Sequence, residues 1–213
     1  MKVVLKIVIP LLVLAVGFGY LFRESLKDVA FAALTRDMFV ASDDDRFDPG
    51  PALGSRFPGL QASYKGRPIT LLDEFAGPKG TVFIASRSID WCPYCMRQMM
   101  QLQENKAGFE AAGIGMVAIT YDEPAVQQAF IDKFKITIPV LSDSTALTFK
   151  TLGILNTDYA PGDFQYGIPH PGIIVVDSGG WVVGKLFLED YSSRVDAAAA
   201  LAFARTALGI PSP

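Results

Sequence analysis

Two cysteines, the only ones in the chain, lie three residues apart where an apolar strand pattern gives way to a helical one. The apolar, β-branched run 81–86 is typical of a buried strand, and a helical pattern begins directly after Cys92. Residues i and i+3 share one face of a helix, so the sulfurs of Cys92 and Cys95 can approach closely enough to form a disulfide. The spacing therefore predicts a redox-active pair at the start of a helix.

The position of each cysteine suggests its role. Cys92 is expected at the helix N-terminus, where unpaired N–H groups and the helix dipole favour an anion. Such an environment lowers the pKa of a thiol and raises the fraction present as thiolate, the reactive form. Pro93 suits the first helical turn, because its missing N–H would be unpaired there. Cys95 lies inside the helix and should be more buried, so we predict that Cys92 attacks and Cys95 resolves.

Other uses of a cysteine pair fit the sequence less well. A zinc site needs more ligands than two cysteines and His170, the single histidine. Covalent haem attachment needs a histidine directly after Cys95, where the chain has Met96. A purely structural disulfide stays open as an alternative, although so small a loop gives little entropic stabilisation. We therefore expect no metal and no cofactor other than the redox-active disulfide.

The first 22 residues have the pattern of a membrane segment. Lys2 and Lys6 precede an uncharged apolar run over 7–22, and bulky residues close that run without a clear cleavage site. We expect an uncleaved transmembrane anchor over 1–22, with a cleavable signal peptide as the alternative. The positive charges precede the run, so the positive-inside rule places the rest of the chain outside the cytoplasm. The predicted location is the inner (cytoplasmic) membrane, with a single pass.

The remaining chain divides into a connecting region and a folded body. Residues 24–41 have helical spacing of apolar residues, and 42–51 is acidic and broken by Pro and Gly, as in a linker. We assign 23–50 to a juxtamembrane helix with this linker, and 51–210 to one folded domain. The net charge of −3 and the pI near 5.2 give no electrostatic reason to expect nucleic-acid binding.

The folded body alternates strand and helix patterns and ends in a hairpin and a helix. Strands are expected over 57–64, 69–72, 81–86, 114–120, 140–141, 172–177 and 181–188. Helices are expected over 93–112, 124–134, 145–152 and 192–208. This order predicts an α/β sandwich with a mixed sheet.

The strand that leads into Trp91-Cys-Pro-Tyr-Cys95, with the elements that follow it, resembles the thioredoxin fold. Residues 53–60 and 134–143 are similar to the opening and central segments of the peroxiredoxin-like branch, also called redoxin or AhpC/TSA. The resemblance covers 51–208. It implies a thioredoxin-like fold, with a central mixed sheet flanked by helices, and an antioxidant oxidoreductase activity.

The resemblance also suggests roles for residues around the cysteines. Pro171 matches the family's cis-proline, which lies against the active-site disulfide and helps to bind an extended substrate segment. His170 either modulates the acidity of Cys92 and contacts substrate, or is an ordinary loop residue. Trp91 is expected to shield the disulfide, and Tyr94 to tune the redox potential by altering thiolate stability.

The chain departs from peroxiredoxins at positions that handle peroxide. Their motif has proline and threonine or serine seven and three residues before the peroxidatic cysteine, where this chain has Ala85 and Ile89. An arginine shortly before the late strand is replaced by Pro171 and Gly172. Those groups orient the peroxide and stabilise charge on its oxygen. Arg87 and Ser88, near Cys92, are candidates to replace them.

These observations predict a membrane-tethered thiol–disulfide oxidoreductase acting through Cys92 and Cys95. A thiol-dependent peroxidase, in which Cys95 captures a sulfenic acid on Cys92, is the alternative enzyme. A non-catalytic tethered binding domain is a third hypothesis. The expected partners are a protein or small-molecule disulfide or a peroxide as substrate, and a thiol protein as electron donor.

Overall fold

A computed structural model describes residues 23–211, which divide into two compact units between Asp37 and Met38. The smaller unit holds the helix α2 (Arg23–Leu34), whose apolar side chains include the exposed Leu26 and Val29. The helical pattern predicted over 24–41 therefore ends early. Two residues near the end of that predicted helix, Phe39–Val40, instead form the strand β1 in the larger unit.

No helix within residues 23–211 has both the length and the apolar character needed to cross a bilayer. The transmembrane anchor predicted over 1–22 lies outside the described residues.

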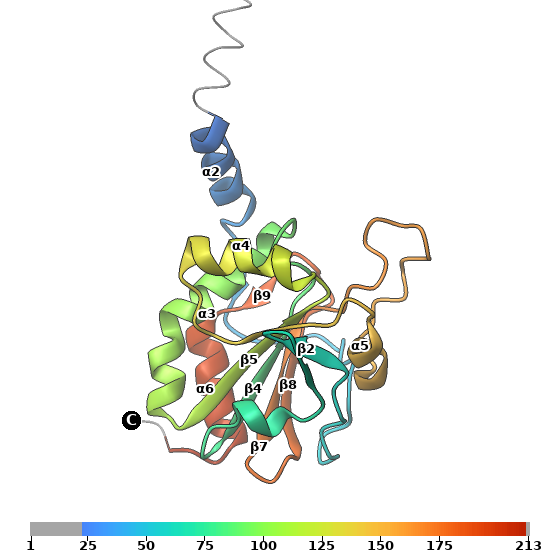
Figure 1. Ribbon diagram of the computed structural model, residues 1–213. Coiled ribbons are helices and arrows are strands. Elements are labelled where there is room, and N and C mark those ends of the chain that lie inside the picture. Colours follow the sequence, from blue (N-terminus) through green and yellow to red (C-terminus); the bar gives the residue numbers. More distant parts are fainter. Residues whose placement is uncertain (1–22, 212–213) are drawn as a thin grey trace, which may run out of the picture. The chain divides into compact units, whose positions relative to one another are not determined.

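The larger unit is built on a seven-stranded mixed sheet with the strand order β3-β2-β6-β5-β4-β7-β8 (Figure 1). The strands are β2 (Ala62–Tyr64), β3 (Arg67–Ile69), β4 (Gly80–Ala85), β5 (Ile114–Thr120), β6 (Val140–Ser142), β7 (Gly172–Asp177) and β8 (Val182–Phe187). β4 pairs in parallel with β5 and antiparallel with β7, which confirms the predicted mixed sheet. Every residue of β4 is buried, as expected for a central strand covered on both faces.

Helices and loops cover the two faces of the sheet. α3 (Pro93–Ala111), α4 (Pro124–Phe134) and α6 (Ala197–Ala207) pack on one face, and Figure 1 shows α3 and α6 side by side. α5 (Leu147–Leu152) and the 3₁₀ helix η1 (Leu72–Phe75) pack on the other. Val82 and Ile84 belong to the first core and Phe83 and Ala85 to the second, as the two-residue period of a strand requires. These layers fix the C-terminal end of β4, where the cysteine loop begins.

The closing helix is shorter than predicted. It begins at Ala197 rather than Ser192, because the side chain of Asp196 accepts the backbone N–H groups of the first turn and caps the helix. The residues before the cap, Arg194–Val195, form β9, which pairs in parallel with β1. A segment predicted as helix is therefore a two-residue strand.

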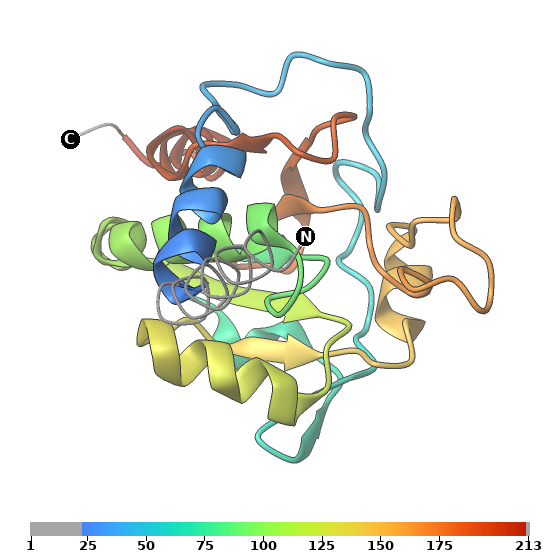
Figure 2. The ribbon, with the colours of Figure 1, turned by 90° about the horizontal axis from the view of Figure 1, so that it is seen from above.

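An acidic segment, residues 43–48, lies along the edge of the sheet. Asp43 Oδ2 accepts a hydrogen bond from the backbone N–H of Phe187 at 2.7 Å. Asp45 Oδ2 accepts one from the N–H of Glu189 at 2.8 Å. Figure 2 shows this segment in light blue, passing along the outside of the body. We call it the acidic strap, because its carboxylates satisfy amides at and just beyond the end of β8.

Further contacts tie the acidic strap to the larger unit. Phe47 packs edge-on against His170, with ring centroids 4.9 Å apart. Lys185 Nζ lies 2.9 Å from Asp48 Oδ1. The sequence predicts a linker here, since acidic residues near Pro and Gly are usually solvated. In the structure the carboxylates instead act as hydrogen-bond acceptors for the edge of the sheet.

The acidic strap gives a stability prediction. Asp43→Ala should lower the free energy of unfolding by about 1 kcal/mol, because the N–H of Phe187 loses its acceptor. Asp44→Ala is the control: it removes the same charge from an exposed residue that makes no side-chain hydrogen bond with the described residues. Chemical denaturation measures both, and equal stability of the two variants would contradict a structural role for Asp43.

Candidate active site

The two cysteines lie at the start of α3, as predicted. Cys92 is the last residue before the helix, with φ −91° and ψ 101°, and Pro93 occupies the first turn. The Cys92 and Cys95 sulfurs are 2.8 Å apart, within hydrogen-bonding distance. Both are free thiols, each only 1% exposed, so Cys92 is as enclosed as Cys95 with respect to solvent.

A buried arginine contacts the inner sulfur. Arg194 Nη2 donates to Cys95 Sγ at 3.3 Å, and the arginine is 3% exposed. Its Nε donates to Gln98 Oε1 at 3.2 Å. Nη1 donates to the carbonyl oxygens of Tyr191 (2.8 Å) and Ser193 (2.6 Å). The guanidinium is therefore held in one orientation, with one arm on the sulfur.

The electrostatics of the pair differ from the sequence-based prediction. The hydrogen bond between the thiols and burial both raise the pKa of Cys92. Burial alone would raise the pKa of Cys95, but the hydrogen bond from Cys92 and the charge of Arg194 lower it well below its usual value. The amide of Ser88 and the hydroxyl of Ser86 act in the same direction. The lowering of the pKa that the sequence predicts for Cys92 thus falls on Cys95, because the hydrogen bond between the thiols and the guanidinium of Arg194 both favour a thiolate there.

A buried carboxylate organises the loop before the cysteines. Asp122 Oδ1 accepts the Ser88 hydroxyl at 2.7 Å, and Oδ2 accepts the N–H of Ile89 at 2.8 Å. The Ser88 oxygen in turn accepts the N–H groups of Asp90 and Trp91, at 3.0 and 3.3 Å. Burial raises the pKa of Asp122. The Ser88 hydroxyl uses its single proton on Asp122, which leaves none to donate to a substrate.

Aromatic side chains surround the approach to Cys92. Trp91 Nε1 donates to the hydroxyl of Tyr121 at 2.8 Å, and the Trp91 ring lies 5.2 Å from that of Phe164. The guanidinium carbon of Arg87 lies 5.4 Å from the Trp91 ring and 5.1 Å from the Tyr191 ring. Phe164 and Tyr191 are 68% and 59% exposed, so they present apolar surface next to Trp91 and Tyr94, the neighbours of Cys92 in sequence or on the helix. We call the four aromatic residues and the arginine that stacks on two of them the aromatic collar: Trp91, Tyr121, Phe164, Tyr191 and Arg87.

Arg87 is a second buried cation at this site. It is 6% exposed, and within the described part of the chain its Nε has no hydrogen-bond partner. Stacking on two rings gives it cation–π stabilisation. Tyr94, between the cysteines, packs edge-on against Tyr191 at 6.1 Å and so joins the helix start to the collar. Arg87 could accept an anionic or oxygen-rich group of a substrate once the collar opens.

His170 and Pro171 precede β7. The peptide bond between them is trans, so the cis-proline expected from the resemblance is wrong for this chain; trans is the favoured state of an X–Pro bond, and here the chain enters β7 directly. Pro171 lines a small cavity together with Gln98 and Arg194. Burial lowers the pKa of His170, whose ring packs on Phe47; none of its described contacts is with a cysteine sulfur.

Two site residues were missed by the sequence analysis. Asp122 follows β5, the parallel neighbour of β4, and the carboxyl ends of neighbouring parallel strands lie together. That topology could have indicated it. Arg194 carried no such signal, because its segment was predicted to be helix.

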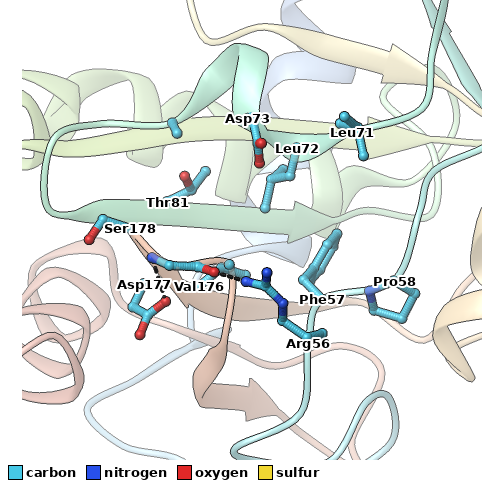
Figure 3. A pocket seen from close by; sticks show the side chains of 13 residues that line it. Arg56, Phe57, Pro58, Leu71, Leu72, Asp73, Thr81, Val176, Asp177 and Ser178 are labelled. Atoms are coloured by element: carbon cyan, nitrogen blue, oxygen red, sulfur yellow. Dashed lines mark hydrogen bonds between the residues drawn. The ribbon is translucent and has the colours of Figure 1, made fainter.

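A cavity of about 500 Å³ lies at the other end of the central strands. Thr81 and Val176, a paired couple at the start of β4 and the end of β7, form part of its wall. Figure 3 shows Arg56 beside it, donating to the backbone oxygen of Gly179. No cysteine borders this cavity. Among the described residues, no group of three or more His, Cys, Asp or Glu side chains is placed to hold a metal.

A mixed sheet with helices on both faces, and two buried thiols where a central strand passes into a helix, is typical of the thioredoxin-like fold. A family model described as the AhpC/TSA family matches residues 53–185. The chain belongs to this family and is a peroxiredoxin-like redoxin.

Solved structures share the fold. A peroxiredoxin-like protein from Aquifex aeolicus is 21% identical, with a TM-score of 0.63 over 75% of this chain and 90% of that one. Peroxidoxin BcpB from Mycobacterium tuberculosis is 18% identical, with a TM-score of 0.58 over 78% and 100%. Reduced Prx3 from Vibrio vulnificus, in complex with H₂O₂, is 20% identical, with a TM-score of 0.62 over 71% and 97%. No curated protein sequence matches the chain.

Proposed function

We propose that this protein is a thiol–disulfide oxidoreductase with Cys92 and Cys95 as its redox pair. The observation that carries the proposal is the 2.8 Å distance between the two sulfurs at the start of α3. A disulfide can form there with only a small movement of the side chains. Cys92 lies just before α3, next to Trp91, whereas Cys95 lies within the helix in contact with Arg194, so we assign Cys92 as the sulfur that meets a substrate first.

The reduced pair carries one proton in this mechanism. The Cys92 sulfur attacks one sulfur of a substrate disulfide, and the substrate S–S bond breaks to release one thiolate. Cys95 then attacks Cys92, breaks the mixed disulfide and releases the second half of the substrate. Two electrons pass from the cysteine pair to the substrate, which leaves as one thiol and one thiolate. A thiol protein then reduces the Cys92–Cys95 disulfide.

Substrate access requires the aromatic collar to move, because Cys92 is 1% exposed in the closed site. Phe164 and Tyr191 are exposed and offer ring faces on which a substrate segment can lie. The segment between α5 and β7, which contains Phe164, projects from the body in both views (Figures 1 and 2). Its displacement would free the Trp91 side of the site.

A peroxidase is the second candidate, supported by the family and by the H₂O₂ complex of a structural relative. The sulfur of Cys92 would attack one peroxide oxygen, break the O–O bond and become a sulfenic acid, while the other oxygen leaves as an alcohol or water. Cys95 would then attack the sulfenic sulfur and release water. Ile89, three residues before Cys92, cannot supply the hydroxyl that orients peroxide, so we place disulfide exchange first.

Activity assays on the purified full-length protein separate the hypotheses. Reduction of insulin or glutathione disulfide, coupled to a thiol donor, supports disulfide exchange. Rapid formation of a sulfenic acid with micromolar peroxide, without disulfide reduction, supports the peroxidase. If the protein shows neither activity, the non-catalytic binding domain is the remaining hypothesis.

We also propose that residues 1–22 anchor the protein in the inner membrane, with the redoxin domain outside the cytoplasm. The support is the sequence pattern alone. Protease added to spheroplasts, cells whose inner membrane is intact, should digest the redoxin domain. Protection of that domain until the cells are lysed would contradict the proposed orientation.

A further inference from the structure

Arg194 carries a buried positive charge that its neighbours must stabilise. A guanidinium keeps its proton in proteins, and a buried charge is costly unless it is paired. Arg194 is 3% exposed, and three of its four hydrogen bonds go to neutral oxygens, one on Gln98 and two on the backbone. The remaining bond goes to Cys95 Sγ, the only ionisable group among these acceptors.

Asp190 is an alternative counter-ion for Arg194. Its charge and that of Arg194 influence each other, but the carboxylate is exposed and accepts hydrogen bonds from Ser192 and Ser193. Solvent therefore screens it from the buried guanidinium. Cys95 is the better partner, since its sulfur is as buried as the arginine and in direct contact with it.

We propose that Arg194 holds Cys95 as the thiolate in the reduced protein, so that the negative charge rests on the inner sulfur and the Cys92 thiol donates a hydrogen bond to it. The 2.8 Å distance between the two sulfurs is short enough for such a hydrogen bond. The Ser86 hydroxyl and the Ser88 amide, in the loop after β4, also lower the pKa of Cys95 and so favour a thiolate there. Among the described residues, Arg194 is the charged side chain with the main influence on the pKa of the two thiols, apart from the cysteines themselves.

The backbone around Arg194 holds it in place for this role. The N–H of Arg194 donates to the carbonyl oxygen of Met38 at 2.7 Å, and the N–H of Asp196 donates to that of Val40 at 2.9 Å. These bonds form the β1–β9 pair, which fixes the strand that carries the arginine. Arg194 is thus a positioning residue: it acts on the reaction through Cys95.

The assignment deepens the proposed function and rests on it for its catalytic consequence. As Cys92 attacks a substrate disulfide, its proton passes to the Cys95 thiolate, which serves as the base. The departing substrate thiolate then takes that proton and leaves as a thiol. Cys95 is again a thiolate and attacks Cys92, so the second step needs no other base. Charge and protons balance, with one thiol and one thiolate released.

The test is a titration of Cys95 alone. In the full-length Cys92→Ser variant, the serine hydroxyl keeps a donor beside Cys95, and the ultraviolet absorbance of the thiolate is followed against pH. We expect a midpoint below about 8.5, the ordinary value for cysteine, with most of the thiolate present at neutral pH. Arg194→Gln in this background should move the midpoint upward by at least about one pH unit. Arg194→Lys should restore part of the shift.

The control is Arg97→Gln, which removes the same charge from an exposed arginine of α3 and should leave the midpoint unchanged. A Cys95 midpoint at or above the ordinary value in Cys92→Ser overturns the inference, whether or not the Arg194 variants fold. Loss of disulfide reduction in the wild type, with Cys95 still titrating low, would instead remove the proposed function and leave this assignment standing. If the enzyme is active, kcat/KM of Arg194→Gln should rise with pH as Cys95 loses its proton, over a pH range in which kcat/KM of the wild type is constant.

Discussion

Cys92→Ser is expected to abolish the reduction of insulin and glutathione disulfide, with a rate at least about a thousandfold below the wild type. A serine hydroxyl at this position cannot act as the sulfur nucleophile that disulfide exchange requires. The variant should keep its fold, because serine can donate the same hydrogen bond to Cys95. Turnover is measured with a coupled thiol donor, and circular dichroism checks the fold.

Cys95→Ser is the matched partner of this variant. It leaves Cys92 to attack, but removes the sulfur that releases the product, so a covalent mixed disulfide with the substrate should accumulate. Mass spectrometry of the non-reduced protein detects the added mass. If Cys92→Ser accumulated the mixed disulfide and Cys95→Ser did not, Cys95 would be the attacking cysteine and Cys92 the resolving one.

Asp122→Ala should be the most destabilising of the polar substitutions at the site, at about 3 kcal/mol of unfolding free energy. The change leaves the buried Ser88 hydroxyl and the N–H of Ile89 without their acceptor. It also frees the loop that holds Cys92, so kcat/KM for disulfide reduction should fall with the stability. Denaturant unfolding and the coupled assay measure the two effects.

The pH dependence of this variant follows from the raised pKa of Asp122, which burial causes. Between the ordinary value of 3.8 and the higher value in the fold, the folded state holds the proton more tightly than the unfolded chain. The stability that Asp122 contributes is therefore greatest below 3.8 and decreases as the pH rises through that window. The difference in unfolding free energy between the wild type and Asp122→Ala should therefore become smaller as the pH rises through that window. Asp132→Ala, at an exposed position on α4, is the control for the loss of one carboxylate.

The central elements could be predicted from the sequence because their patterns are local. β5 and β7 and helix α4 occupy the predicted residues, since continuous apolar runs bounded by Gly and Pro determine them. The start of α6 could not be predicted in this way. The Ala-rich pattern predicts a helix that begins earlier in the chain. In the structure, Arg194–Val195 instead pairs with β1, a strand more than 150 residues earlier.

The position of the cysteine pair was predictable, but its charge distribution was not. The helix N-terminus argues for a thiolate on Cys92, and that argument uses only neighbouring residues. Arg194 reverses it from a distant part of the chain, in direct contact with the inner sulfur. Asp122 likewise acts from the strand next to β4. Long-range contacts of this kind carry no periodic signal in a single sequence.

Both outer strands of the sheet carry features that hinder further pairing. The acidic strap occupies amides at the end of β8, and Pro68 in β3 has no N–H to offer a neighbour. Molecules crowded together therefore gain little by adding strand to strand, which protects against aggregation. A protein shortened to begin at Pro51 would lose the strap along with β1, and we expect it to self-associate and to precipitate at concentrations where the longer chain stays dispersed.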